Sequence, residues 1–119
     1  MPYKTVYEKI DEATNGSAEI YTIIPSGIAF SESPNINVRV DNLEQIFKNI
    51  ESICSEDKRK FIMSYWFQPD ATMHKEGCYA DSVKTQMDLI DRYVEKMCSS
   101  LDNTIVIITA DHGLIDGSE

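Results

Sequence analysis

The apolar residues of the chain fall into three strand-like runs, separated by stretches with the periodicity of helices. The runs cover residues 19–24, 61–67 and 104–110. The last run is nearly unbroken and rich in β-branched residues, which is typical of a strand buried on both faces. Strands of that kind belong to parallel sheets covered by helices, so this run favours an α/β protein.

Apolar residues at helical spacing predict three helices, over residues 3–13, 43–53 and 80–99. Asp41 is expected to cap the second helix, with Glu44 three residues later as in a capping box. Residues 26–40 have no clear period and predict a loop, with a short strand at 36–40.

The order of the elements predicts how the chain folds. Strands that alternate with helices imply parallel strands joined by right-handed crossovers. The chain has 119 residues, which is enough for one domain with its own core. We therefore expect a single α/β domain over residues 1–119, with a mainly parallel sheet flanked by helices.

Two of the strand-like runs end close to an acid and an imidazole. Asp111 and His112 follow the third run, and Gly113 lets the backbone turn sharply after them. Asp70 follows the second run, and His74 comes four residues later. Because a parallel sheet binds ligands beyond the carboxyl ends of its strands, the four side chains are expected to meet at one edge.

Carboxylate and imidazole side chains together favour zinc, and also suit manganese or iron. Four protein ligands are too few for two tetrahedral ions, so water, substrate or further protein groups must complete the sites. The alternative interpretation is that both histidines are structural or merely exposed. For Thr72 we expect a loop-capping role rather than contact with substrate. We expect Asp116 to be solvated, and the alternative is that it belongs to the site.

Composition and charge narrow the possible partners. The formal net charge of -9 argues against a nucleic acid polymer, although it suits a site for multivalent cations. No apolar signal segment or membrane-spanning run is present in the sequence, so no membrane partner is expected. Cys54, Cys78 and Cys98 show no CxxC spacing and are interpreted as reduced thiols, which predicts a cytoplasmic protein.

Two sequence motifs resemble the metal-binding motifs of a known superfamily. The first is Pro69-Asp70-x-x-x-His74-x-x-Gly77, and the second is Ala110-Asp111-His112-Gly113 at the end of a β-branched run. In this order, and separated by one long helix, they resemble the alkaline phosphatase superfamily. Within it, the chain is most similar to the type I phosphodiesterase/nucleotide pyrophosphatase family. The resemblance covers roughly residues 61–113.

This resemblance implies an alkaline phosphatase-like three-layer core and two divalent metal ions, usually zinc, with manganese as an alternative. It implies hydrolysis of small phosphate esters, of the phosphodiester or nucleotide pyrophosphate type, through a covalent intermediate on Thr or Ser. Asp70 and His74 would bind one ion, and Asp111 and His112 the other. Gly77 and Gly113 would serve the geometry of the loops.

The chain departs from the family pattern in several places. Met73 stands where the family commonly has glycine, and we identify no nucleophile motif, no earlier aspartate ligand and no histidine after His112. We therefore expect a carboxy-terminal fragment of a larger hydrolase that is inactive alone, and we assign no catalytic residue. A fragment would expose a sheet edge, which favours a homo-oligomer.

Two other functions fit the same sequence. One is a phosphomutase of the same superfamily, such as a cofactor-independent phosphoglycerate mutase, which has similar Asp-His-Gly motifs. The other is a non-catalytic α/β interaction module in which the two Asp–His pairs are incidental. The sequence does not identify the substrate.

Overall fold

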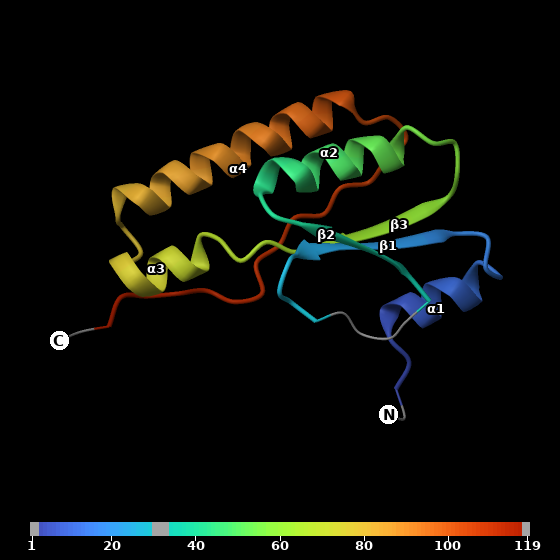
Figure 1. Ribbon diagram of the computed structural model, residues 1–119, viewed down its shortest axis with the longest axis horizontal. Coiled ribbons are helices and arrows are strands. Elements are labelled where there is room, and N and C mark those ends of the chain that lie inside the picture. The colour runs from blue at the N-terminus through green and yellow to red at the C-terminus, as the bar shows by residue number, and fades with distance from the viewer. Residues whose placement is uncertain (1–2, 30–33, 118–119) are drawn as a thin grey trace. The chain divides into compact units, whose positions relative to one another are not determined.

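The computed structural model describes residues 3–29 and 34–117 of the chain (Figure 1). In these ranges the sheet has three strands, with β1 (Glu19–Pro25) between β2 (Ile36–Val40) and β3 (Lys60–Ser64). Both pairs are parallel. The predicted α/β class and the parallel sheet are therefore confirmed, and the short strand expected at 36–40 is present.

The core of the sheet lies on the face covered by helix α2, Leu43–Cys54. Ile23 of β1, Val40 of β2 and Ile46 of α2 are almost completely buried and form one cluster. Burying an aliphatic side chain of this size contributes about 1.5–3 kcal/mol. The helix predicted for residues 43–53 is therefore present, and its apolar stripe packs on the sheet.

The other face of the sheet is covered by helix α1, Val6–Ala13, as Figure 1 shows. Successive side chains of a strand point to opposite faces. Ile62 of β3 packs against the core cluster under α2, so Phe61 points the other way. There the ring of Tyr7 meets the ring of Phe61 edge to face, with centroids 6.4 Å apart. Helices on both faces explain why β1 is mostly apolar.

Asn42, and not Asp41, caps helix α2. The Asn42 side chain accepts a hydrogen bond of 3.0 Å from the backbone N–H of Gln45. The Asp41 carboxylate instead accepts from the hydroxyl of Ser26 at 2.9 Å. The capping residue is one position later than the sequence predicted, because an asparagine caps a helix as well as an aspartate does, whereas the helix itself begins at Leu43 as predicted.

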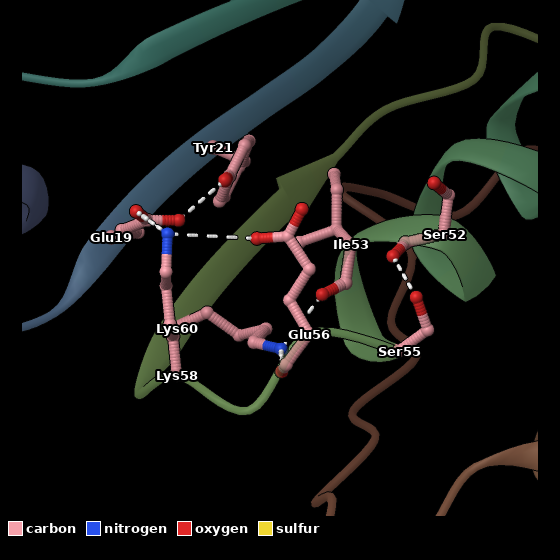
Figure 2. Close-up of polar contacts among 8 residues, drawn as sticks. All are labelled: Glu19, Tyr21, Ser52, Ile53, Ser55, Glu56, Lys58 and Lys60. Carbon is pink, nitrogen blue, oxygen red and sulfur yellow. Dashed lines mark hydrogen bonds and ion pairs between the residues drawn. The ribbon is translucent and has the colours of Figure 1, made fainter.

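A group of charged side chains ties the starts of β1 and β3 together (Figure 2). Glu19 accepts hydrogen bonds from the Tyr21 hydroxyl at 2.6 Å and from Lys58 at 3.0 Å. These two bonds lower the pKa of Glu19, the one from Tyr21 most. Lys60 donates to the backbone oxygens of Ile53 and Glu56 at the end of α2, where a cation suits the helix dipole.

The chain divides into two compact units, Met1–Trp66 and Phe67–Glu119. The sheet belongs to the first unit. The second contains helix α3, Asp70–Glu76, and helix α4, Asp81–Ser100, followed by residues 101–117 without regular structure. The long helix predicted at 80–99 is confirmed within one residue at each end. Residues 70–76, expected in a loop, are helical.

The strand predicted at residues 104–110 is wrong. These residues have no strand hydrogen bonding in the structure, and the side chains of Ile105 and Ile107 are 89% and 84% exposed. An apolar β-branched run becomes a strand only when another strand supplies hydrogen bonds to its backbone. The sequence pattern predicts that such a run prefers the strand conformation, but it does not show whether another strand is present to pair with it.

Within the described ranges, β2 and β3 each pair with one strand only, so both are edges of the sheet. Assembly of a homo-oligomer through such an edge stays a prediction. None of the helices in those ranges combines the length and apolarity that crossing a membrane requires.

The cap of α2 can be tested with two variants. We expect Asn42→Ala to lower the free energy of unfolding by about 1 kcal/mol, because the N–H of Gln45 loses its acceptor. Asp41→Ala should cost less than about 0.5 kcal/mol, because it removes only an exposed bond to Ser26. Urea unfolding monitored by circular dichroism measures both. A larger loss for Asp41→Ala would show that the cap is misassigned.

The charged group at Glu19 predicts a dependence of stability on pH. Because its pKa is lower in the folded chain, Glu19 contributes stability above its ordinary pKa. That contribution disappears as the pH falls through the folded-state pKa. Glu19→Gln should therefore lose less stability than the wild type between about pH 7 and about pH 3 in urea unfolding. Glu95→Gln, an exposed change on α4, should lose as much as the wild type, and equal losses in all three proteins would contradict the assignment.

Candidate metal centre

Helix α3 places the first Asp–His pair on one face. Residues four apart in a helix are neighbours, so the seven-residue helix brings Asp70 and His74 together. Oδ1 of Asp70 lies 3.4 Å from Nε2 of His74, and both side chains are exposed to solvent. The spacing of the first motif is therefore a helical spacing, which its interpretation as a loop did not reveal.

The second pair lies on the segment that follows α4, within the same unit. Nε2 of His112 lies 3.7 Å from Oδ1 of Asp70 and 3.6 Å from Oδ1 of Asp111. The imidazole of His112 is thus close to two carboxylates, one from each motif. The four predicted residues form one series of contacts, from His74 through Asp70 and His112 to Asp111.

The imidazole of His112 is oriented by its own backbone. Nδ1 lies 2.9 Å from the carbonyl oxygen of Gly113. A carbonyl oxygen only accepts hydrogen bonds, so Nδ1 is the donor, and Nε2 faces the two carboxylates. The bond to Gly113 raises the pKa of His112 most, and the charges of Asp111 and Asp70 raise it further. The surroundings of Nε2 therefore favour a cation.

The separations between the side chains can be compared with those around a metal ion. Two atoms that bind one zinc ion tetrahedrally, each at about 2.0–2.2 Å, lie about 3.3–3.5 Å apart. The Asp70–His74 separation falls in this range, and the Asp111–His112 separation is slightly wider. Across the residues that the structure describes, however, no group of three or more acidic, cysteine or histidine side chains is arranged to hold a metal. The donor types and spacings fit an ion, and the role of the four residues as ligands stays a prediction.

A hollow of about 250 Å³ adjoins the site. Met73, His74 and Gly77 line one side of it, and residues 114–117 line the other. His74 therefore lies both in the series of Asp–His contacts and at the edge of a space open to small molecules.

Thr72, which sits between the two residues of the first motif, is buried and does not face the site. Its hydroxyl donates to Oε1 of Gln68 at 2.9 Å and accepts from Nε2 of Gln86 at 2.9 Å. The backbone N–H of Thr72 also donates to Gln68 at 3.1 Å. Thr72 therefore links α3 to the residue Gln68 before it and to Gln86 of α4, from within a helix and not as the cap of a loop.

Asp116 is exposed, as the sequence predicted, and it also makes a contact near the site that the sequence did not predict. Its carboxylate accepts a hydrogen bond of 2.7 Å from the backbone N–H of Cys78. This bond, together with one to the Cys78 side chain, lowers the pKa of Asp116. Its place four residues after His112, as Cys78 stands four residues after His74, was the available signal.

Comparison with known families identifies the class of protein. A family model described as type I phosphodiesterase/nucleotide pyrophosphatase matches residues 4–119. The chain therefore belongs to this family, whose members carry out phosphodiesterase or pyrophosphatase chemistry and are generally metal-dependent. No curated protein and no solved structure matches the chain. The family resemblance seen at residues 61–113 is confirmed. The match also extends over the residues before 61, which include α1, β1, β2 and α2.

The role of Thr72 predicts the effect of removing its hydroxyl. Thr72→Val should lower the free energy of unfolding by about 1–3 kcal/mol, because the side chains of Gln68 and Gln86 lose a buried partner. The matched change Thr85→Val, on the exposed side of α4, should cost less than about 0.5 kcal/mol. Thermal and urea unfolding measure both. If Thr72→Val is as stable as Thr85→Val, the buried network does not hold α3 in place.

Proposed function

We propose that this chain carries residues of the two-metal site of a phosphate-ester hydrolase, acting on phosphodiesters or nucleotide pyrophosphates. Asp70 and His74 bind one ion, and Asp111 and His112 bind the other. Zinc suits this mixture of carboxylate and imidazole donors best, and manganese is the alternative. Family membership supports the reaction class.

One observation carries the proposal. A single carboxylate oxygen, Oδ1 of Asp70, lies within 3.7 Å of the imidazole nitrogens of both His74 and His112. These are the only two histidines of the chain, and 37 residues separate them in the sequence. If the two Asp–His pairs were incidental, nothing in the sequence would require them to converge on one oxygen.

The charges near the site also support a role for cations. Asp70 and Asp111 are carboxylates, and the whole chain has a formal net charge of -9. A phosphate ester is itself an anion, so these side chains alone would repel it. Divalent ions held by these residues would reverse the local charge and would supply the chemistry of such sites, polarisation of a phosphoryl oxygen and activation of a nucleophile at neutral pH.

The side chains have separate tasks in this scheme. The bond from Nδ1 of His112 to Gly113 fixes the ring so that Nε2 remains available as a ligand. The helical spacing of Asp70 and His74 presents their two donor atoms to one ion. The hollow beside His74 offers room for the part of a small phosphate ester next to its phosphate.

Metal binding tests the proposal directly. We expect the purified chain, loaded with Zn²⁺ and dialysed, to retain zinc by elemental analysis. The double change Asp111→Ala and His112→Ala should weaken zinc binding in calorimetry by more than about 100-fold, because losing ligands costs more than losing the outer partners of ligands. Asp91→Asn, an exposed carboxylate change on α4, should leave zinc binding unchanged.

The other outcomes identify the competing functions. A chain that retains neither zinc nor manganese would overturn the proposal and favour a non-catalytic interaction module. A chain that binds the metal in all variants alike would bind it elsewhere. With the metal site established, an assay of the full-length enzyme against bis-p-nitrophenyl phosphate would distinguish an esterase from a phosphomutase.

A further inference from the structure

Asp116 connects the two segments that carry the Asp–His pairs. Its Oδ1 accepts the backbone N–H of Cys78 at 2.7 Å. Cys78 lies four residues after His74, just past the end of α3, and Asp116 lies four residues after His112. The hydrogen bond therefore joins the chain at equal sequence distances from the two histidines. Figure 1 shows the carboxy-terminal segment running beside α3.

The geometry of this contact depends on Gly77, which ends α3 with a φ of 92°. A side chain rarely adopts this backbone conformation, whereas glycine does so without strain. A Cβ atom at Gly77 would lie 3.6 Å from Oδ1 of Asp116. The Asp116 carboxylate thus lies directly against the turn at the end of α3.

The contacts of the histidines themselves are too weak to account for their convergence. Nε2 of His112 is 3.6–3.7 Å from its two carboxylates, which is too long for hydrogen bonds, and the side chains involved are exposed. Exposed ion pairs contribute little to order. His112 also lies on a segment without helix or strand, which lacks the hydrogen bonding that would fix it. Some other contact must hold this segment against α3.

The bond between Asp116 and Cys78 has the properties that this task requires. It is exposed, as the histidine contacts are, but at 2.7 Å it is within hydrogen-bonding distance, and its acceptor is a carboxylate, which makes a stronger hydrogen bond than a neutral oxygen. The bond to Cys78 lowers the pKa of Asp116, as expected when a hydrogen bond stabilises the charged carboxylate. The bond joins a side chain to a backbone N–H beside a helix end, so its position is fixed on the α3 side.

We propose that Asp116 is a positioning residue for the candidate metal centre: its bond to Cys78 holds residues 111–116 so that His112 meets Asp70. The proposed role of Asp116 in metal binding rests on the proposed function. Its effect on the positions of His112 and Asp70 can be tested without any metal. Asp116 is not assigned as a ligand of the ion, although it is one of the residues that line the hollow beside His74. It acts through the backbone of the segment that carries Asp111 and His112.

The test uses nuclear magnetic resonance of the metal-free chain. In the wild type we expect a nuclear Overhauser effect between the His112 ring and the β-protons of Asp70. Asp116→Ala should abolish this effect and expose the Cys78 amide to hydrogen exchange. Asp116→Asn keeps an acceptor oxygen and should retain the effect. Asp88→Asn, which alters a carboxylate bonded to Lys84 on α4, should change neither reading.

A second reading measures the consequence for metal binding. Asp116→Ala should weaken zinc binding by about ten-fold or more in calorimetry, the range found when groups that orient ligands are removed. Unfolding curves of each variant establish that it is folded. Asp116→Asn should recover most of the affinity, which a general loss of stability would not allow.

The outcomes separate this proposal from the proposed function. If Asp116→Ala exposes the Cys78 amide but keeps the His112–Asp70 effect, Asp116 does not position the site. If Asp116→Asn loses the effect as Asp116→Ala does, the acceptor oxygen of residue 116 is not what positions His112. If the wild type lacks the His112–Asp70 effect, the positioning role also fails. If the wild type shows the effect but binds no zinc, only the proposed function fails.

Discussion

The candidate site depends on the carboxylate of Asp70, which is the point where its two halves meet. Its position in the first turn of α3 places His74 one helical turn away, on the same face. The same Oδ1 atom also lies near His112. In the sequence, His112 comes 38 positions after His74. Removing this one carboxylate would leave two imidazoles with no shared partner.

The electrostatics around Asp70 are negative where His112 approaches. The bond to Gly113 raises the pKa of the His112 ring most, and the charges of Asp111 and Asp70 raise it further. A proton on Nε2 of His112 would supply positive charge between the two carboxylates. A divalent ion would supply more, and it would compete with that proton for the same nitrogen. The family's general dependence on metals is consistent with this balance.

Sequence reasoning predicted the elements of the first unit because their local signals agree with their packing. Residues 43–53 have an apolar stripe, and α2 buries that stripe on the sheet. Prediction from the sequence failed where the structure of a segment depends on a partner that is distant in the sequence. The run at 104–110 has the composition of a strand but pairs with none among the described residues. Asp41 and Asn42 are equally good caps by type, and only the geometry selects Asn42.

The candidate site shows the same division between local and distant information. Asp70, His74, Asp111 and His112 were all identified from sequence, because acids beside imidazoles stand out by their chemistry. Their convergence was predicted at the edge of a sheet, by way of a strand that the structure does not contain.

What brings the pairs together must therefore act without that strand. Fixing the backbone costs about 1–2 kcal/mol for each residue ordered, and residues 101–117 have no regular structure to offset this cost. Exposed ion pairs offset little of it. The bond from Asp116 to the backbone beside α3 is also exposed, but it is short and charge-assisted, and it joins the segment to α3 four residues after His112. An aspartate that looks like one more solvated acid in a chain of formal charge -9 is for this reason the hardest part of the site to recognise from sequence.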